Sequence, residues 1–291
     1  MPSACSTVRK SNTLMPEAGD SGIRLQIFLD GNGFGPGVVD GRNGEFTRKA
    51  LELYGQSHGL SPSFEPDTRY IRPYTVYTVT DSDVGTLGTM AESPQELAKQ
   101  EKLPYVRLSE LIGERFHTTE AFLQELNAGV DLNRIPAGTV LRVPNIRNPF
   151  SFKQFPSRYP AAAGAGGGER RVVVDTQSRM LRVLDSDRLI AAFPITPGST
   201  EHPAPLGSWR VVGAVPWPWY RYDEGVLKRG ERTDVFYHLP PGPNSPVGIL
   251  WAGLNRPGVG IHGTSSPETI GRAGSHGCIR LANWDVATLH T

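Results

Sequence analysis

The sequence predicts a multidomain protein in which a small α-helical unit and an α+β unit precede a mainly-β domain. With 291 residues, the chain suits two or three modest domains better than one. Its 33 glycines and 25 prolines favour turns and short strands over long helices. The apolar pattern changes from helical spacing in the first half to short runs between polar turns in the second half.

Charge and apolar content exclude two kinds of partner. The 30 Lys and Arg residues against 29 Asp and Glu leave a formal net charge of +1, so we expect no basic surface for nucleic acid. No apolar run approaches the roughly 18 residues that a transmembrane helix needs. Residues 1–21 contain no apolar core of a signal peptide, and we expect them to be a disordered leader. Nothing in the composition indicates an oligomeric state.

The first ordered unit is predicted at residues 22–66. Residues 23–29 suit a short helix, and a glycine-rich loop follows at 31–37. Residues 40–44 form an Asp/Gly/Asn turn, and residues 45–56 are predicted to be a second helix with one apolar stripe. Because no Lys-Ser/Thr pair follows the glycine-rich loop, a phosphate-binding P-loop is excluded.

A second unit is predicted at residues 74–145. It opens with a strand at 77–80 and closes with a strand within 135–144. Between them, residues 108–116 and 119–126 are predicted to be amphipathic helices. A pair of threonines before the second of these helices supplies natural N-caps.

Residues 146–169 are predicted to be a linker, because prolines followed by an Ala/Gly run offer little to bury. From residue 170 to 291 the pattern is typical of a β domain, a sandwich or a curled sheet. Short apolar runs separated by polar turns follow one another at 172–175, 180–184 and 189–193. The aromatic side chains of residues 217–220 could line a groove or could pack as core or lid.

Two segments near the end of the chain contain residue types that are typical of nucleophilic catalysis. His262 lies in an Ile-His-Gly-Thr run, and Cys278 ends a Ser-His-Gly-Cys run. The thiolate is the nucleophilic form of cysteine, and a thiol with an ordinary pKa of roughly 8.5 needs a base such as imidazole to reach it at neutral pH. Neighbouring glycines let backbone N–H groups approach a reacting carbonyl, as an oxyanion hole requires. The pattern predicts nucleophilic acyl transfer.

Two other interpretations use the same residue types. Cys278 could be a buried, inert thiol near an unrelated imidazole. Alternatively, a zinc ion could be held by His238, His262, His276 and Cys278. The spacing of these residues is not that of a known zinc finger and no second cysteine is near, so we expect no metal and no cofactor.

The stretch IHGTSSPETIGRAGSHGCIRL, from Ile261 to Leu281, resembles the signature of the L,D-transpeptidases, the YkuD-type catalytic domain. That pattern is HGT, a short variable loop, and then S-x-G-C-[IV]-R. The resemblance implies that Cys278 is the nucleophile and that His262 is the general base. It also implies that the backbone carbonyl of Gly263 orients the imidazole, where other enzymes use a carboxylate.

The same resemblance assigns the remaining residues of the motif. Main-chain N–H groups of His276, Gly277 and Cys278 would shape the oxyanion hole, while Ser275 would make hydrogen bonds within the loop. Arg280 would hold the turn or pair with a substrate carboxylate, and Thr264 would belong to the substrate-binding region.

The implied reaction has two steps. The thiolate attacks an L-to-D peptide bond of a peptidoglycan stem peptide, at diaminopimelate–D-alanine, and D-alanine leaves a thioester behind. An amine of a second stem peptide then forms a 3→3 cross-link, as part of cell wall biogenesis. Water as the acceptor would make an L,D-carboxypeptidase, and a protein amine would make a protein-anchoring enzyme. A non-catalytic peptidoglycan-binding protein is the alternative from another class.

Both front units also resemble wall-binding modules. Residues 22–66 resemble the small helical peptidoglycan-binding domain, whose DG-x-x-G-x-x-T-x-x-A core is matched by Asp40, Gly41, Gly44, Thr47 and Ala50. Residues 74–145 resemble a LysM module, which binds the glycan of peptidoglycan or chitin, with Asn127 at its helix-terminal position. Residues 81–107 intervene where a LysM module passes quickly from strand to helix, so this unit could be only a spacer.

The implied substrate lies outside the cytoplasmic membrane. We therefore expect a periplasmic or extracellular cell-wall location, with an export signal that was trimmed or lies upstream of this chain. Domains of this family usually continue through another helix and strand after the motif, whereas the sequence stops at Thr291. The resemblance thus implies a catalytic domain that is incomplete at its C-terminus.

Overall fold

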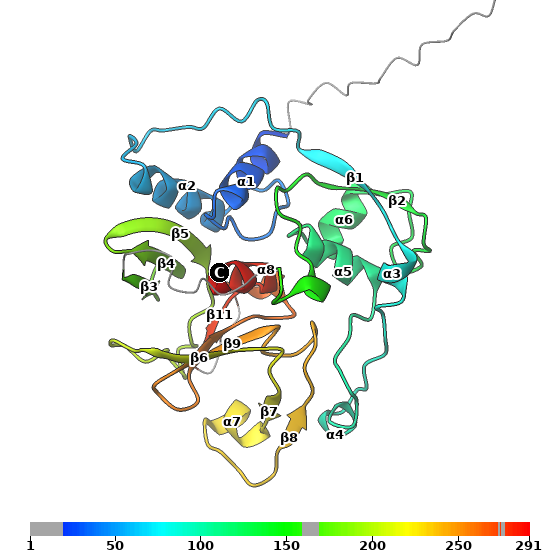
Figure 1. Cartoon of the computed structure of the whole chain (residues 1–291), viewed down its shortest axis with the longest axis vertical. Helices are drawn as coiled ribbons and strands as arrows, with labels where there is room; N and C mark the ends of the chain where they lie inside the picture. The colour runs from blue at the N-terminus through cyan, green and yellow to red at the C-terminus, as the bar shows by residue number, and fades with distance from the viewer. Residues whose placement is uncertain (1–19, 159–168, 273, 275–276) are drawn as a thin grey trace, which may run out of the picture.

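The computed structural model describes residues 20–158, 169–272, 274 and 277–291. Figure 1 shows two helices of the first unit above the sheets of the C-terminal unit, with the second unit beside both. The predicted mainly-β character of the C-terminal domain is confirmed, and the part before it is largely helical.

The first unit consists of two helices joined by the glycine-rich loop. They are α1 (Ser21–Gly31) and α2 (Glu45–Ser57). The buried side chain of Gln26 fixes the loop, because its Oε1 accepts from the backbone N–H groups of Asp40 and Gly41 at 3.0 and 2.8 Å. Its amide also donates to the carbonyl of Arg42 at 3.0 Å. The Asp-Gly turn thus forms around a single buried amide.

The second unit pairs two strands around short helices. Its elements are β1 (Tyr74–Thr78), α3 (Asp81–Val84), α4 (Pro94–Leu97), α5 (Leu108–Arg115), α6 (Glu120–Leu126) and β2 (Val140–Pro144). Both predicted helices are present, and Thr119 caps α6 by accepting from the N–H of Phe122 at 3.1 Å. The first strand ends earlier than predicted because Thr80 leaves it to form a capping box with Asp83 at the start of α3.

The C-terminal unit contains sheets of four, three and two strands with orders β11-β10-β9-β6, β3-β4-β5 and β7-β8. The strands are β3 (Arg170–Asp175), β4 (Met180–Asp185), β5 (Arg188–Pro194), β6 (Val211–Pro216), β7 (Tyr220–Tyr222), β8 (Tyr237–Leu239), β9 (Leu250–Leu254), β10 (Gly260–His262) and β11 (Ile279–Arg280). The helices are α7 (Glu224–Arg229) and α8 (Asn283–His290). Only β10 and β11 pair in parallel within these sheets; the other described pairs are antiparallel.

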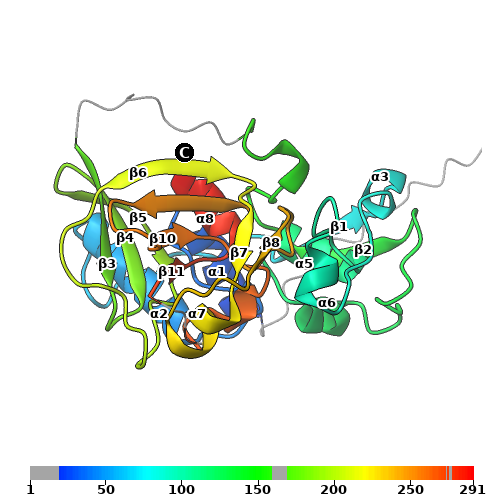
Figure 2. The ribbon, with the colours of Figure 1, turned by 90° about the horizontal axis from the view of Figure 1, so that it is seen from below.

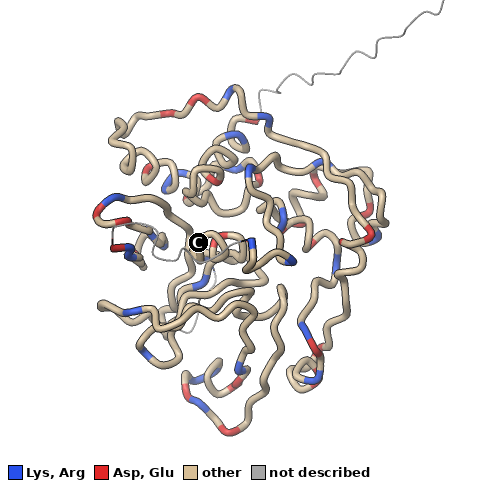
Figure 3. The backbone as a smooth tube through the Cα atoms, in the orientation of Figure 1, with Lys and Arg blue, Asp and Glu red and all other residues tan. Residues whose placement is uncertain are grey.

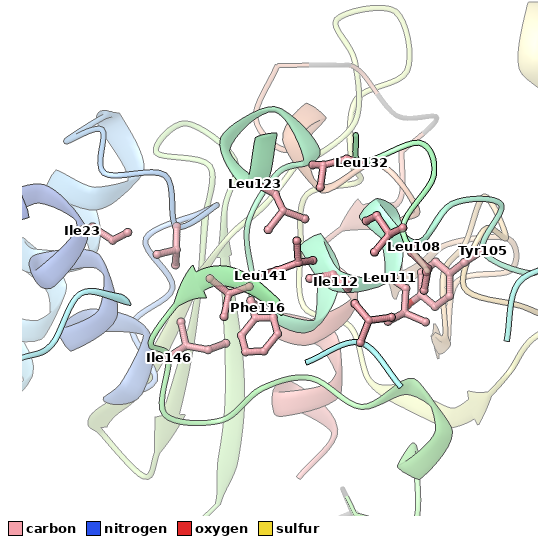
Figure 4. Close-up of a cluster of buried hydrophobic side chains, with 14 of the residues drawn as sticks. Ile23, Tyr105, Leu108, Leu111, Ile112, Phe116, Leu123, Leu132, Leu141 and Ile146 are labelled. Carbon is pink, nitrogen blue, oxygen red and sulfur yellow. The ribbon is translucent and has the colours of Figure 1, made fainter. Parts of the chain in front are cut away.

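The hydrophobic cores cross the boundaries between the units. Figure 4 shows Ile23 of α1 near the apolar side chains of the second unit, and Ile23, Leu111 and Leu141 belong to one buried cluster. A second cluster joins Phe34 of the first unit to Met180 and Ala192 of the three-stranded sheet. The three units therefore fold against each other instead of standing apart.

Half of the predicted linker is packed. Ile146, Phe150 and Phe155 are 6%, 3% and 4% exposed, and the indole N–H of Trp217 donates to the carbonyl of Phe155 at 3.1 Å. Three large apolar side chains among the prolines supply this burial, which the proline and glycine content obscured. Residues 159–168 lie outside the described part of the chain.

The segment that departs from the LysM pattern touches the C-terminal unit. The N–H of Leu103 donates to the carbonyl of Pro241 at 2.9 Å, and the N–H of Asn244 donates back to Leu103 at 3.2 Å. Figure 2 shows β8 on the side of the C-terminal unit that faces the second unit. Residues 81–107 thus supply contacts between the two units.

Two further features concern the charged residues and the helices. Figure 3 shows that the positions of Lys and Arg alternate with those of Asp and Glu along the backbone of all three units. Across the described residues, no helix combines the length and the apolar character needed to cross a membrane.

Candidate active site

The parallel pairing of β10 with β11 brings the two predicted catalytic residues to one face. Ile261 lies opposite Ile279 and His262 opposite Arg280, which sets Cys278 beside Gly260. Side chains alternate along a strand, so Cys278 and Arg280 share the face of His262, whereas the two isoleucines point into the core. The backbone of Gly260 lowers the pKa of the Cys278 thiol, in agreement with this register.

His262 is a buried, neutral imidazole. It is 4% exposed, its ring stacks on Trp251 at a centroid distance of 5.5 Å, and its Nδ1 lies 2.6 Å from the carbonyl oxygen of Gly263. Because a carbonyl can only accept, Nδ1 carries the proton and Nε2 has the lone pair of a base. Burial lowers the pKa of His262 to about 4, and the charge of Arg280 acts in the same direction.

Cys278 is protonated at rest. Burial raises the pKa of its thiol, while the hydrogen bond from Gly260 and the positive charge of Arg280 oppose that rise. The Sγ–H group lies 3.5 Å from the carbonyl oxygen of Gly258. A thiol in this state reacts as a nucleophile only when a base removes its proton.

Arg280 is held by its backbone, and its cation is near enough to Cys278 to lower the pKa of the thiol. Its N–H and carbonyl exchange hydrogen bonds with Thr196 at 3.0 and 2.9 Å. Its buried Nε has no hydrogen-bond partner among the described residues. The pKa of Tyr220, on β7, is raised by burial and by the nearby Cys278, so this ring also lies at the site. Of the aromatic residues at 217–220, Tyr220 is thus close enough to Cys278 for the two to interact electrostatically, whereas Trp217 packs against the core.

The other predicted site residues differ in where they lie. Gly277 has φ of 87°, a left-handed conformation that favours glycine. Thr264 is 3% exposed and its hydroxyl accepts from the N–H of Ser266 at 3.2 Å, which puts it inside the loop instead of on an accessible surface. Ser275 and His276 lie outside the described residues.

Asn283, at the start of α8, is a site residue that the sequence analysis missed. Its Oδ1 accepts from the N–H of Ile249 at 3.2 Å, and a Cβ added to Gly263 would lie 2.2 Å from that oxygen. Gly263 must therefore be glycine for the amide to fit beside it. No local pattern marks Asn283, because the contacts that involve it come from distant parts of the chain.

Within the described residues, no group of three or more His, Cys, Asp and Glu side chains is arranged to hold a metal ion. The arrangement that is present consists of a thiol, a neutral imidazole whose tautomer is fixed, and a cation on one sheet face. Such a set can generate a thiolate, attack a carbonyl and return the proton to a leaving group.

Comparison with known proteins identifies the C-terminal unit. Residues 169–291 match the family model of the L,D-transpeptidase catalytic domain, YkuD. A Bacillus licheniformis protein assigned as the L,D-transpeptidase YkuD is 29% identical over 180 residues, covering 62% of this chain and 84% of that protein. This match is longer than the segment 169–291, so it extends into the residues before it.

Two solved structures are similar over smaller parts. The L,D-transpeptidase from Mycobacterium smegmatis is 18% identical with a TM-score of 0.34, over 54% of this chain and 70% of that one. The Enterococcus faecium L,D-transpeptidase is 20% identical with a TM-score of 0.31, over 42% of this chain and 45% of that one. The chain thus spans less than half of the E. faecium protein. On the strength of the family match and the Bacillus relative, residues 169–291 belong to the YkuD family of L,D-transpeptidase catalytic domains.

Proposed function

We propose that this protein is a cysteine-dependent L,D-transpeptidase that acts on peptidoglycan stem peptides in cell wall biogenesis. One observation carries the proposal: the β10–β11 pairing sets Cys278, the neutral His262 and Arg280 on one face, within the segment that matches the family. Such substrates lie outside the cytoplasmic membrane, so the proposed location is the periplasm or the cell wall.

In the proposed first step, Nε2 of His262 takes the proton of Cys278 Sγ while the sulfur attacks the carbonyl carbon of the L-to-D bond. Because burial lowers the pKa of His262 and raises that of Cys278, a resting thiolate–imidazolium pair is disfavoured. The proton therefore moves as the sulfur attacks. The Gly263 carbonyl stabilises the imidazolium that forms, as the carboxylate does in a catalytic triad.

Collapse of the tetrahedral intermediate breaks the C–N bond. His262 returns its proton to the nitrogen of the leaving D-alanine, and a thioester on Cys278 remains. In the second step an amine of another stem peptide loses a proton to His262, attacks the thioester and restores the thiol. Water in place of the amine gives L,D-carboxypeptidase activity, and a protein amine gives protein anchoring. Arg280 would pair with a carboxylate of the donor peptide.

The test is to incubate the purified protein with a disaccharide-tetrapeptide from peptidoglycan. D-alanine release and a 3→3 cross-linked dimer are expected, and a tripeptide without dimer would identify water as the acceptor. Cys278→Ala should abolish both products while the circular dichroism spectrum stays unchanged. Full activity in that variant would show that Cys278 is not the nucleophile. No turnover by the folded wild type, with retention on insoluble peptidoglycan, would favour the non-catalytic binding protein.

A further inference from the structure

A carboxyl group of the second unit is buried against the catalytic unit. Glu114, on α5, is 7% exposed, and its Oε1 accepts from the side-chain amide of Asn283 at 2.7 Å. Its Oε2 accepts from the hydroxyl of Tyr105. Both oxygens are thus occupied, one by its own unit and one by the unit that holds Cys278.

Glu114 supplies the shortest of the hydrogen bonds that orient the Asn283 amide. An amide has a donating end and an accepting end. Nδ2 donates to Glu114 at 2.7 Å and to the carbonyl of Pro243 at 3.4 Å, and Oδ1 accepts from the N–H of Ile249. The same Oδ1 occupies the space where a Cβ on Gly263 or on Gly248 would lie, 2.2 Å away in each case.

Gly263 in turn orients the proposed base. Its carbonyl accepts from Nδ1 of His262 at 2.6 Å, and its N–H donates to Leu250 at 3.3 Å. Without the amide of Asn283 beside it, Gly263 would lose part of the packing that limits its backbone conformations, although Val286 and Gly248 would still lie against it. A continuous set of contacts therefore leads from Glu114 to the imidazole.

We propose that Glu114 is a positioning residue, which acts through Asn283 and Gly263 to hold the imidazole of His262. This inference rests on the proposed function, in which His262 is the base. It makes the second unit part of the catalytic apparatus, whatever the unit also binds.

The surroundings of Glu114 support a fixed interface. Asn244 of the catalytic unit donates to the carbonyl of Pro104 at 2.8 Å and to Glu110 Oε2 at 3.2 Å. Burial raises the pKa of Glu114 to about 7, and the bonds from Tyr105 and Asn283 oppose that rise. Burying a carboxyl group costs folding free energy. A role in orienting Asn283 would account for a carboxyl group at this interface.

The experiment uses the full-length protein with Glu114→Ala, Glu114→Gln and Asn283→Ala, and with Glu125→Ala on α6 as the control. Glu125 is a good control because its side chain is 58% exposed. Two rates are measured well below the melting temperature: D-alanine release, and alkylation of Cys278 by iodoacetamide from pH 5 to 9.

For Glu114→Ala we expect kcat and the alkylation rate at pH 7 to fall about tenfold, with KM little changed, because a misplaced base loses only part of the roughly 10²–10⁴-fold that general-base catalysis contributes. Glu114→Gln should restore most of both rates, because its carbonyl can still accept from Asn283. The double variant Glu114→Ala/Asn283→Ala should be no slower than Asn283→Ala alone, since both changes break one set of contacts. Glu125→Ala should match the wild type.

Unchanged alkylation and kcat in Glu114→Ala would overturn the proposal, as would losses that multiply in the double variant. A lower melting temperature with unchanged rates would show a structural role only and would equally overturn it. If the wild type releases no D-alanine, the proposed function fails. The alkylation profile still decides whether Glu114 affects the Cys278–His262 pair.

Discussion

His262 lies directly opposite Arg280 in the parallel pair of β10 and β11. The register gives the imidazole a cation as its neighbour and brings the same cation to the thiol of Cys278. One pairing of two short strands therefore affects the protonation of both reactive groups.

The first prediction concerns the pH dependence of catalysis. Burial lowers the pKa of His262 to about 4, so the imidazole remains a neutral base over the whole range above that value. We expect the acid limb of the kcat/KM profile to have its midpoint near pH 4 and not near the ordinary value of roughly 6.5. The profile is measured in stopped-time assays, with circular dichroism to verify that the protein is folded at each pH. A midpoint between pH 6 and 7 would contradict the prediction.

A second prediction tests the charge of Arg280. Because its guanidinium lowers the pKa of the Cys278 thiol, Arg280→Gln should move the pH profile of Cys278 alkylation to higher pH. Arg170→Gln, at an exposed residue of β3, is the control and should leave the profile in place. Superimposable profiles for all three proteins would mean that Arg280 does not stabilise the thiolate.

A third prediction links Glu114 to stability. Its pKa is about 7 in the folded protein and near 4.5 when exposed, so between these values the folded state binds more protons than the unfolded state. Stability from this group is present below pH 4.5 and is lost as the pH rises through 7. The melting temperature of the wild type should therefore fall relative to that of Glu114→Gln as the pH rises from 5 to 8. A constant difference across that range would contradict the raised pKa.

The fourth prediction concerns a contact of the first unit with the loop between the two motif segments. Gly271 has φ of 74°, and a Cβ there would lie 2.3 Å from the ring of Phe46 on α2. Gly271→Ala should lower the free energy of unfolding by about 1–3 kcal/mol, from backbone strain and the clash together.

Adding Phe46→Ala to that variant should cost less than Phe46→Ala costs the wild type, because the clash is then relieved. Gly55→Ala on α2 serves as the control, since a Cβ there meets no atom within 4 Å. Urea unfolding of the wild type, the two single variants at Phe46 and Gly271 and the double variant measures the coupling. Strict additivity would show that Phe46 and Gly271 do not interact in solution.

A fifth prediction concerns wall binding by the front units, which remain wall-binding modules by sequence resemblance alone. The full-length Cys278→Ala protein should sediment with insoluble peptidoglycan. A large excess of soluble stem tetrapeptide should leave part of it bound, because the glycan sites would lie outside the active site. Complete release by the tetrapeptide, or sedimentation no greater than that of an unrelated protein, would reduce the front units to their structural role.

The sequence by itself determined the features that depend on short-range chemistry. The helix α2, the Thr119 cap of α6 and the strands β3, β4 and β5 follow from apolar periodicity, capping and turn residues within a few positions. The motif likewise contained Cys278 and His262, because the residue types and their order carry the chemistry. Even the misplaced end of β1 has a local cause, the capping box at Thr80.

Only the tertiary structure decided how the units meet. Glu114 and Asn283 are 169 positions apart, and Phe46 reaches Gly271 from another unit. Such contacts depend on which apolar faces bury each other, and periodicity gives the face of an element but not its partner. For the same reason the aromatic residues of 146–158 could be taken for a linker. The thiol, the imidazole and the cation could be identified from the residues, whereas the contacts that support the imidazole required the folded chain.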